Sequence, residues 1–376
     1  MTNQRGMTLV ELMIALTIGL MLLAGAASMF ITNKRIYQDI GDLGALQENG
    51  RFALELMMKD LRMAGYPGCD NDLELVNNRL NDISGLPSPN NTDMLEFTSG
   101  IEGSESGSNW APSNNSTDIV DTYGDGAQQD MVSGTDAITV RYLAPIVIGG
   151  TATTVNGAGV TAASDDVPVS STQSLAAGDL IAVSDCDAAD IFQITGLASS
   201  KIKHASASAS ALPAGPNNST GNISKFPVGA DVNRYVVRRY FVGLDQKGTD
   251  GGGNPIYAPA LFWETPDTFG DPQVLVEGVE NMQILYGKDT DDDNIANSYV
   301  TATDAALGNT AANWERVVNV KISMLMRTPE VNGNLENDTN TYNLLGSVVG
   351  PYNDKRRRRI FKTTVQVRNQ YQGNDK

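Results

Sequence analysis

Histidine and cysteine are scarce in this chain, which has one histidine and two cysteines among 376 residues. A single imidazole cannot form a two-histidine metal site, and a catalytic triad or cysteine–histidine pair would have to use that ring. The histidine is His204, in a Lys-His-Ala-Ser-Ala-Ser run that is typical of a surface loop. We therefore expect no catalytic residue and no enzymatic activity, although catalysis by carboxylates alone stays open.

Positive charge is also in short supply. The chain has 27 Lys and Arg against 44 Asp and Glu, so its formal net charge is -17. A surface of that sign repels a phosphate backbone, and we do not expect nucleic-acid binding. Only 19% of residues are charged and 41% are hydrophobic, which argues against a charge-driven disordered chain. The length is sufficient for one large domain or two ordinary ones.

The first long uncharged stretch lies at the N-terminus. Residues 1–6 are polar with one positive charge, Glu11 follows, and residues 12–31 carry no charged side chain. About 20 apolar residues are the length that an α-helix needs to cross a bilayer. A secretory signal peptide cleaved near the small residues 24–26 is one alternative, but the apolar run is longer than its usual hydrophobic region; a plain membrane anchor fits the length. Neither explains the carboxylate of Glu11.

Glu11 is informative because an ionisable group near the end of a membrane-spanning helix is unfavourable unless it is paired. A positive charge from another chain would supply a charge-assisted hydrogen bond at low dielectric. The surrounding run, Gly6-Met7-Thr8-Leu9-Val10-Glu11-Leu12, resembles the class III leader of type IV prepilins and pseudopilins. The resemblance implies that a prepilin peptidase cuts between Gly6 and Met7 and N-methylates Met7, where phenylalanine is commoner. It also implies that Glu11 pairs with the amine of a neighbouring subunit's first residue.

The helix is expected to continue beyond the membrane segment. No proline occurs before Pro67, and apolar residues recur at helical spacing through residues 36–61. The pattern predicts a helix from residue 7 to about residue 64, roughly 85 Å long. We divide it into a transmembrane half, residues 7–31, and an amphipathic half, residues 32–64, after a leader of residues 1–6. A coiled-coil stalk would require unbroken heptads with charged flanks, and these are absent.

Residues 65–376 are predicted to form a β-rich head. Short runs with period-two alternation and many β-branched residues alternate with long loops rich in Ser, Asn, Thr and Gly. The predicted strands are 94–98, 137–143, 180–183, 191–194, 235–242, 274–277, 282–286, 317–326 and 360–368. An inserted subdomain is a candidate interpretation of residues 99–230. The fold class is therefore α+β and pilin-like, with a long N-terminal helix packed on a large, loop-rich antiparallel sheet.

The two cysteines are Cys69, just after the predicted helix, and Cys186. Two cysteines in an exported chain most simply form one disulfide, here closing a loop of about 117 residues. Free or metal-binding cysteines are the weaker alternative, because no CxxC spacing exists.

An acidic run offers a candidate metal site. Asp289, Asp291 and Asp293 have the spacing that begins many calcium loops. The EF-hand pattern then fails, because Asn294 occupies the glycine position and Val300 the position of the bidentate glutamate. Calcium is thus a candidate ligand, with a solvated acidic turn as the alternative; no other cofactor is expected.

A basic run, Lys355-Arg356-Arg357-Arg358-Arg359, precedes the last predicted strand. We expect some of these arginines to lie on a strand or hairpin edge, where they prevent edge pairing or face a neighbouring protein.

Several motifs narrow the resemblance to minor pilins of the PilW type. These motifs are Asn49-Gly50-Arg51-Phe52-Ala53-Leu54-Glu55, Asp60-Leu61-Arg62-Met63-Ala64-Gly65-Tyr66, Tyr286-Gly287-Lys288-Asp289-Thr290-Asp291, Trp314-Glu315-Arg316-Val317-Val318 and residues 361–369. The resemblance implies a protein that joins other minor pilins in an initiation or tip complex of a type IV pilus. It would support pilus biogenesis, twitching motility and adhesion.

The implied partners are other minor pilins, the major pilin, the prepilin peptidase and the inner-membrane assembly platform, with a tip adhesin as a further candidate. The implied location is the bacterial inner membrane, with a single pass and a periplasmic head, and then the pilus tip outside the cell. A large pseudopilin of type II secretion has nearly the same parts and stays open. A membrane-tethered adhesin or enzyme is the alternative from another class.

Overall fold

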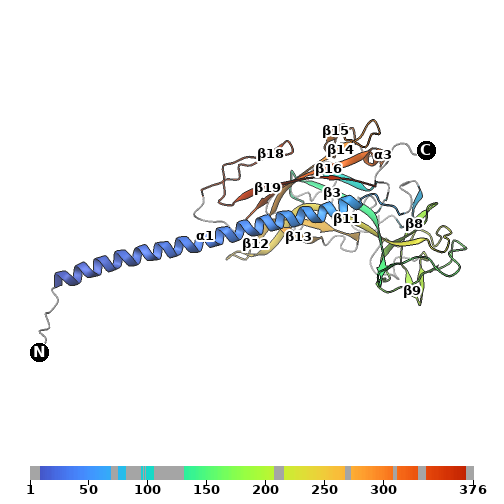
Figure 1. The fold of residues 1–376 in the computed structure, drawn as a ribbon, viewed down its shortest axis with the longest axis horizontal. Helices are drawn as coiled ribbons and strands as arrows, with labels where there is room; N and C mark the ends of the chain where they lie inside the picture. Colours follow the sequence, from blue (N-terminus) through green and yellow to red (C-terminus); the bar gives the residue numbers. More distant parts are fainter. Residues whose placement is uncertain are drawn as a thin grey trace, which may run out of the picture. The chain divides into compact units, whose positions relative to one another are not determined.

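A computed structural model describes residues 9–68, 75–81, 95, 97, 99–105, 131–206, 216–266, 272–307, 311–328 and 336–369. The chain divides into two compact units, Met1–Glu48 and Asn49–Lys376. Helix α1 (Leu9–Met63) supplies the described part of the first unit and the beginning of the second (Figure 1). The predicted helix is confirmed to within two residues at its C-terminal end, and residues 7 and 8 lie outside the described residues.

In the first unit, three hydroxyl side chains of α1 are satisfied within the helix. The hydroxyl of Thr17 donates to the carbonyl oxygen of Ile14, Ser28 to Gly25 and Thr32 to Ser28, each at 2.9 Å. Because these hydroxyls need no partner from outside, the segment can present an apolar surface to its surroundings.

Glycine and proline end α1, as the sequence predicts. Gly65 adopts a φ of 76°, the left-handed conformation that closes many helices, and Pro67 follows. The N–H of Gly65 donates to the carbonyl of Arg141 at 2.9 Å, which ties the helix end to a strand. The amide of Asn369 lies 3.3 Å from the carbonyl oxygen of Met63, so the C-terminal segment also contacts this end.

The largest sheet of the second unit has eight strands. They are β1 (Val76–Asn78), β2 (Ile101–Glu105), β3 (Asp136–Pro145), β7 (Leu180–Ser184), β8 (Ala189–Gln193), β11 (Asp231–Thr249), β12 (Pro255–Glu264) and β13 (Gln273–Glu277). The order is β1-β8-β7-β11-β12-β13, and β3 pairs with both β11 and β2. The long strand β11 is central, because it pairs antiparallel with β3, β7 and β12. The pairing of β1 with β8 is parallel.

A second sheet has four antiparallel strands in the order β15-β14-β16-β19. Its strands are β14 (Val279–Lys288), β15 (Ser298–Val300), β16 (Val317–Arg327) and β19 (Arg358–Gln366), with the short helix α3 (Ala311–Glu315) before β16. Alternate residues such as Ile284, Ile322 and Val365 are buried, while Thr364 and Gln366 are exposed. The alternation that predicted these strands thus corresponds to one buried and one exposed face.

Eight of the predicted strands coincide with observed ones, and residues 94–98 lie mostly outside the described residues. Strand β12 was not predicted; Pro255 and Pro259 interrupt its sequence pattern. Small sheets complete the head: β6 (Val167–Pro168) with β10 (Lys201–Lys203) and β9 (Gly196–Ala198), β4 (Val147–Ile148) with β5 (Thr151–Ala152), and β17 (Tyr342–Leu344) with β18 (Ser347–Val349). The insertion at residues 99–230 stays a prediction. Four strands from this range, β2, β3, β7 and β8, belong to the main sheet.

The part of α1 that belongs to the second unit docks on both large sheets. Its buried face includes Ala53, Met57 and Leu61, each fully buried. At Gly50 the ring of Phe361 from β19 approaches so closely that an added Cβ would lie 2.6 Å from it. A larger residue at this position would displace the ring, so the glycine of the motif at residues 49–55 has a packing explanation.

A buried carboxylate fixes this docking. Asp60 is fully buried in the same helical face. Its two oxygens accept hydrogen bonds from the guanidinium of Arg238 at 3.0 and 2.8 Å and from the hydroxyl of Tyr142 at 2.9 Å; the hydroxyl of Tyr240 also donates. These partners belong to β3 and β11, which Figure 1 shows alongside this part of α1. The carboxylate therefore specifies where the helix sits on the sheet.

We expect Asp60→Asn to lower the free energy of unfolding by about 2–3 kcal/mol, because the guanidinium of Arg238 loses its charged partner. Urea titration of the full chain in detergent, followed by tryptophan fluorescence, measures the change. The control is Glu55→Gln on the exposed side of the same helix, where the ion pair with Arg51 is 3.8 Å long and solvated. We expect this control to change stability by less than about 0.5 kcal/mol. Equal effects of the two substitutions would contradict the anchoring role of Asp60.

A second buried carboxyl joins the two large sheets. Asp136 on β3 accepts the backbone N–H of Ile284 on β14 at 2.6 Å. Burial raises the pKa of Asp136 to about 7; the bond from Ile284 opposes this shift and the charge of Glu105 adds to it. The folded protein therefore favours the protonated form near neutral pH.

This raised pKa predicts a pH-dependent stability. Because the folded pKa exceeds the unfolded one, the stabilisation is complete below about pH 4 and is lost as the pH rises to about 7. Asp136→Asn keeps an acceptor for Ile284 and cannot ionise. We expect the variant to be more stable than wild type at pH 8, by up to about 4 kcal/mol, and to lose this advantage below about pH 4. Urea titrations of wild type and variant at both pH values measure the difference in free energy of unfolding. A difference of the same size at the two pH values would contradict the prediction.

Candidate functional site

The first candidate site is the N-terminal part of α1. Glu11 lies in the first turn with its side chain exposed, where the positive end of the helix dipole favours a carboxylate. The predicted processing residues Gly6 and Met7 lie outside the described residues. The helix is long and apolar enough to cross a membrane, and none of its most apolar window is buried within the chain.

The apolar side chains of this segment are exposed. Examples are Leu9 at 75%, Met21 at 76% and Phe30 at 71% exposure. So large a contiguous apolar surface is not stable in water and requires lipid or the helices of other chains. The segment can therefore exchange a membrane for a bundle of similar helices without losing its apolar environment.

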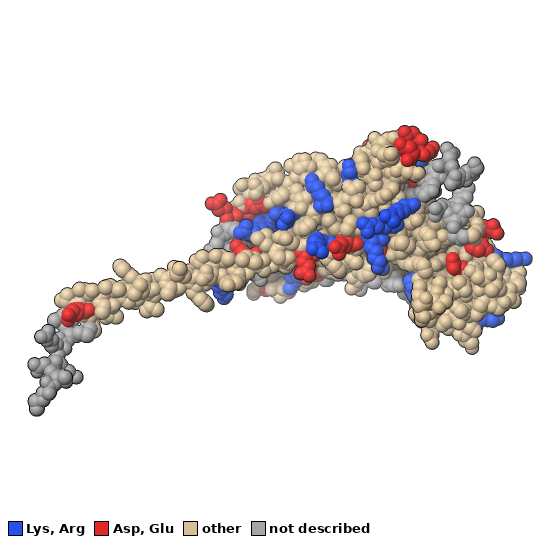
Figure 2. All heavy atoms as spheres, in the orientation of Figure 1, with Lys and Arg blue, Asp and Glu red and all other residues tan. Residues whose placement is uncertain are grey.

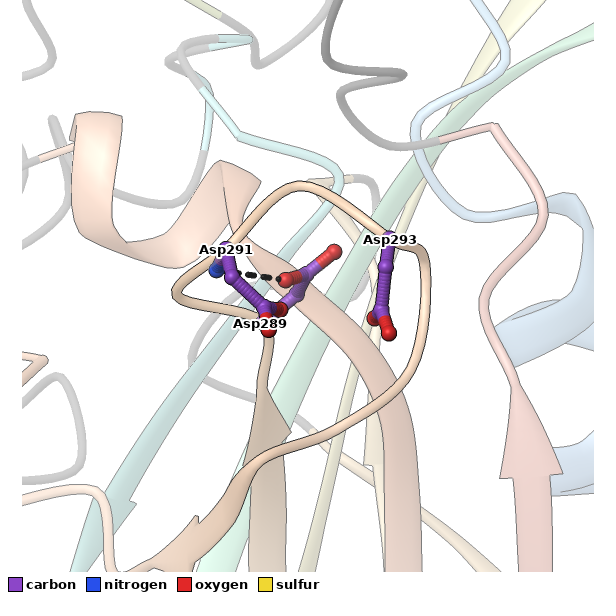
Figure 3. Close-up of side chains that lie close together, drawn as sticks. All are labelled: Asp289, Asp291 and Asp293. Carbon is purple, nitrogen blue, oxygen red and sulfur yellow. Dashed lines mark hydrogen bonds between the residues drawn. The ribbon is translucent and has the colours of Figure 1, made fainter.

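The second candidate site is the loop between β14 and β15. The candidate ligand atoms of Asp289, Asp291 and Asp293 lie within 4.8 Å of one another (Figure 3). Burial acts to raise the pKa of Asp289, but backbone N–H donors from Asn294, Asp291 and Asp292 outweigh it, so this pKa lies below its ordinary value. Asp289 is thus ionised and organises the loop, while Asp291 and Asp293 are exposed.

The loop conformation partly fits calcium. Asn294 adopts a φ of 62°, the left-handed conformation that the calcium pattern assigns to glycine, so asparagine is a workable replacement there. Val300 lies in β15 and offers no carboxylate, so the bidentate ligand of an EF-hand is missing at that position. Three carboxylates at this separation can surround a cation with 2.3–2.6 Å bonds, roughly the calcium geometry. Calcium binding stays a hypothesis.

If the loop binds calcium, titration calorimetry of the full chain in detergent is expected to show binding in about the 0.1–1 mM range. Asp291→Asn combined with Asp293→Asn should abolish the heat. The control is Asp304→Asn, which alters a nearby exposed carboxylate that accepts the N–H of Ala306. The absence of heat in the wild type, or its persistence in the double variant, would contradict the hypothesis.

The disulfide prediction concerns Cys69 and Cys186. Cys186 is disulfide-bonded and lies in the turn between β7 and β8, whereas Cys69 lies outside the described residues. Strand β1 pairs with β8 in parallel from Val76 and Ala189 onward, so both strands begin at the same end of the pair. This arrangement favours the pairing of Cys69 with Cys186, which stays a prediction.

One expectation about polar residues was wrong, and another is confirmed only in part. His204 is not on a surface loop: it is 2% exposed, and its Nε2 atom lies 2.8 Å from the carbonyl oxygen of Asp165. Arg358 of the basic run does begin an edge strand, but its side chain is fully buried. Its guanidinium donates to Glu280, Asp338 and Asp354 at 2.6–3.0 Å. Burial and these carboxylates act in opposite directions, and the carboxylates prevail, so the pKa of Arg358 is raised.

Asp60 and Arg358 were not recognised as structural residues from the sequence. For Asp60 a signal existed, because it falls in the helical register of Ala53, Met57 and Leu61. A carboxylate on an apolar helix face indicates a charged partner on the opposing element. For Arg358 no local signal existed, since its neighbours in the sequence are also cations.

Comparison with known families gives two matches. Residues 239–369 match the family model described as type IV pilus-assembly protein W. Residues 1–27 match the prokaryotic N-terminal methylation motif. The first match includes the strands from the middle of β11 to β19 and the acidic loop; the second includes Gly6, Met7 and Glu11. No curated protein and no solved structure matches the chain.

Proposed function

Because the chain is a type IV pilus minor pilin of the PilW family, we propose that it joins other minor pilins in a complex that initiates pilus assembly. In this proposal the complex stays at or near the pilus tip and supports pilus biogenesis, twitching motility and adhesion. The N-terminal helix fits an inner-membrane anchor. The head would lie in the periplasm before assembly and outside the cell afterwards.

The observation that carries the proposal is the exposed apolar segment with a carboxylate in its first turn. In the membrane, lipid covers this segment; in a filament, the equivalent helices of other pilins replace lipid. The carboxylate of Glu11 then sets the axial position, because in an apolar bundle it is stable only beside a positive charge. The terminal amine of an adjacent processed pilin would supply that charge.

The size of the head supports a position at the tip. The second unit begins at Asn49 and contains all the described sheets. A head of this bulk would crowd its neighbours if it repeated along a shaft, whereas a tip has no neighbour on one side. The match to a pilus-assembly family favours a pilus over type II secretion, and the family is a structural component rather than an enzyme.

We expect Glu11→Ala to leave the protein in the membrane and to lower the number of surface pili by about tenfold or more. The physical reason is that the helix loses the charge that registers it in the bundle. Electron microscopy and immunoblotting of sheared pili and membrane fractions measure the two outcomes. Normal piliation by Glu11→Ala would overturn the proposed function.

The matched control is Thr17→Ala, which also removes a polar group from the apolar segment. The hydroxyl of Thr17 donates to its own helix, so we expect normal piliation. Mass spectrometry of the wild-type N-terminus accompanies the experiment. A mature chain that begins with methylated Met7 agrees with the proposal, whereas cleavage after Ala26 would indicate an ordinary secreted protein.

A further inference from the structure

A cluster of cations lies at the C-terminal end of α1, in the part of the helix that belongs to the head. Lys59 and Arg62 are exposed on the outer side of α1, and Arg368 is exposed just after β19. The amide of Asn369 lies 3.3 Å from the carbonyl oxygen of Arg62, which places Arg368 next to this end of the helix. Of the ion pairs within the described residues, none involves these three cations. We call Lys59, Arg62 and Arg368 the basic cluster.

Apolar surface accompanies the basic cluster. Phe52 is 49% exposed, and Leu56 and Met63 are partly exposed on the same stretch of helix. Figure 2 shows Lys and Arg side chains gathered over the region that this part of α1 and β19 occupy in Figure 1, with fewer acidic side chains among them. The chain as a whole carries a net charge of -17, and these three exposed cations form a local basic surface on it.

The same helix carries the complementary charge one segment earlier. Residues 36–50 contain Asp39, Asp42 and Glu48 and no Lys or Arg, with Ile36, Ile40 and Leu43 at helical spacing. Within one chain these two segments follow each other along a single helix and cannot pair side by side. Between two parallel pilin helices shifted along their axes, an acidic amphipathic segment of this kind would lie against the basic cluster.

We propose that the basic cluster, with Phe52, is the docking surface for an acidic amphipathic helix of an adjacent pilin. The inference rests on the proposed function, because a filament is what places such helices in parallel with an axial shift. The apolar residues supply contact area, and the cations select an acidic partner and fix the shift. A helix with a basic outer face is rejected at this position.

The test combines cross-linking with charge reversal in the full-length protein in cells. A photoreactive benzoylphenylalanine at position 52 is expected to form an adduct with another pilin, and peptide mass spectrometry is expected to place the adduct on an acidic helical segment. Lys59→Glu, Arg62→Glu and Arg368→Glu together should lower the adduct about tenfold, since each exposed ion pair contributes a fraction of a kcal/mol.

Two controls separate charge from folding. Lys59→Arg, Arg62→Lys and Arg368→Lys together keep the charge and should keep the adduct. A second control makes the same change of charge at exposed positions elsewhere in the head and should also keep the adduct. It combines Lys201→Glu, Lys203→Glu and Lys225→Glu. Thermal unfolding of each purified variant should match that of wild type, because the altered side chains are exposed.

Some outcomes overturn the inference without affecting the proposed function. One such outcome is an unchanged amount of adduct after charge reversal, and another is an adduct to lipid or to a protein that is not a pilin. A third is that the control at residues 201, 203 and 225 loses as much adduct as the charge reversal in the basic cluster. Failure of the proposed function appears separately, as normal piliation by Glu11→Ala.

Discussion

One guanidinium nitrogen of Arg238 donates to both carboxylate oxygens of Asp60, and this contact determines how the helix and the head are combined. Apolar packing alone would allow the helix to slide or rotate over a sheet, because hydrophobic contact is not directional. A buried carboxylate with three hydrogen-bonding partners on two strands permits only one position. Every feature of the second unit that depends on the helix's orientation, including which residues of α1 face outward, follows from this contact.

The elements of the fold were largely predictable, and their contacts were not. The period of apolar residues and Pro67 define α1, and alternation defines strands such as β3, β16 and β19. Strand β12 lacks that alternation and was missed. The partners of Asp60 lie 82 to 180 residues away in the sequence. A local pattern can show that Asp60 needs a partner, but the register of β3 and β11 decides which residues supply it.

The same distinction holds for the candidate sites. Glu11 was recognisable because its chemistry conflicts with its neighbours, and this conflict is visible in a single sequence. The acidic loop was recognisable by spacing, whereas its conformation, with Asn294 in a left-handed state, required coordinates. The burial of Arg358 and of His204 was not predicted, because a polar residue among polar neighbours looks solvated until three-dimensional packing buries it.

Two contacts join the first residues of the head in the sequence to its last strand and the residues after it. They are the contact of Gly50 with Phe361 and the contact of Met63 with Asn369. Ribosomes deliver the helix first and β19 last, so the inner face of the helix remains uncovered while some 300 intervening residues are synthesised and exported. Loop closure over such a distance is slow relative to local folding. A nascent chain of this design therefore leaves the inner face of the helix without its packing partner until β19 is made, and β19 is the strand that completes the head.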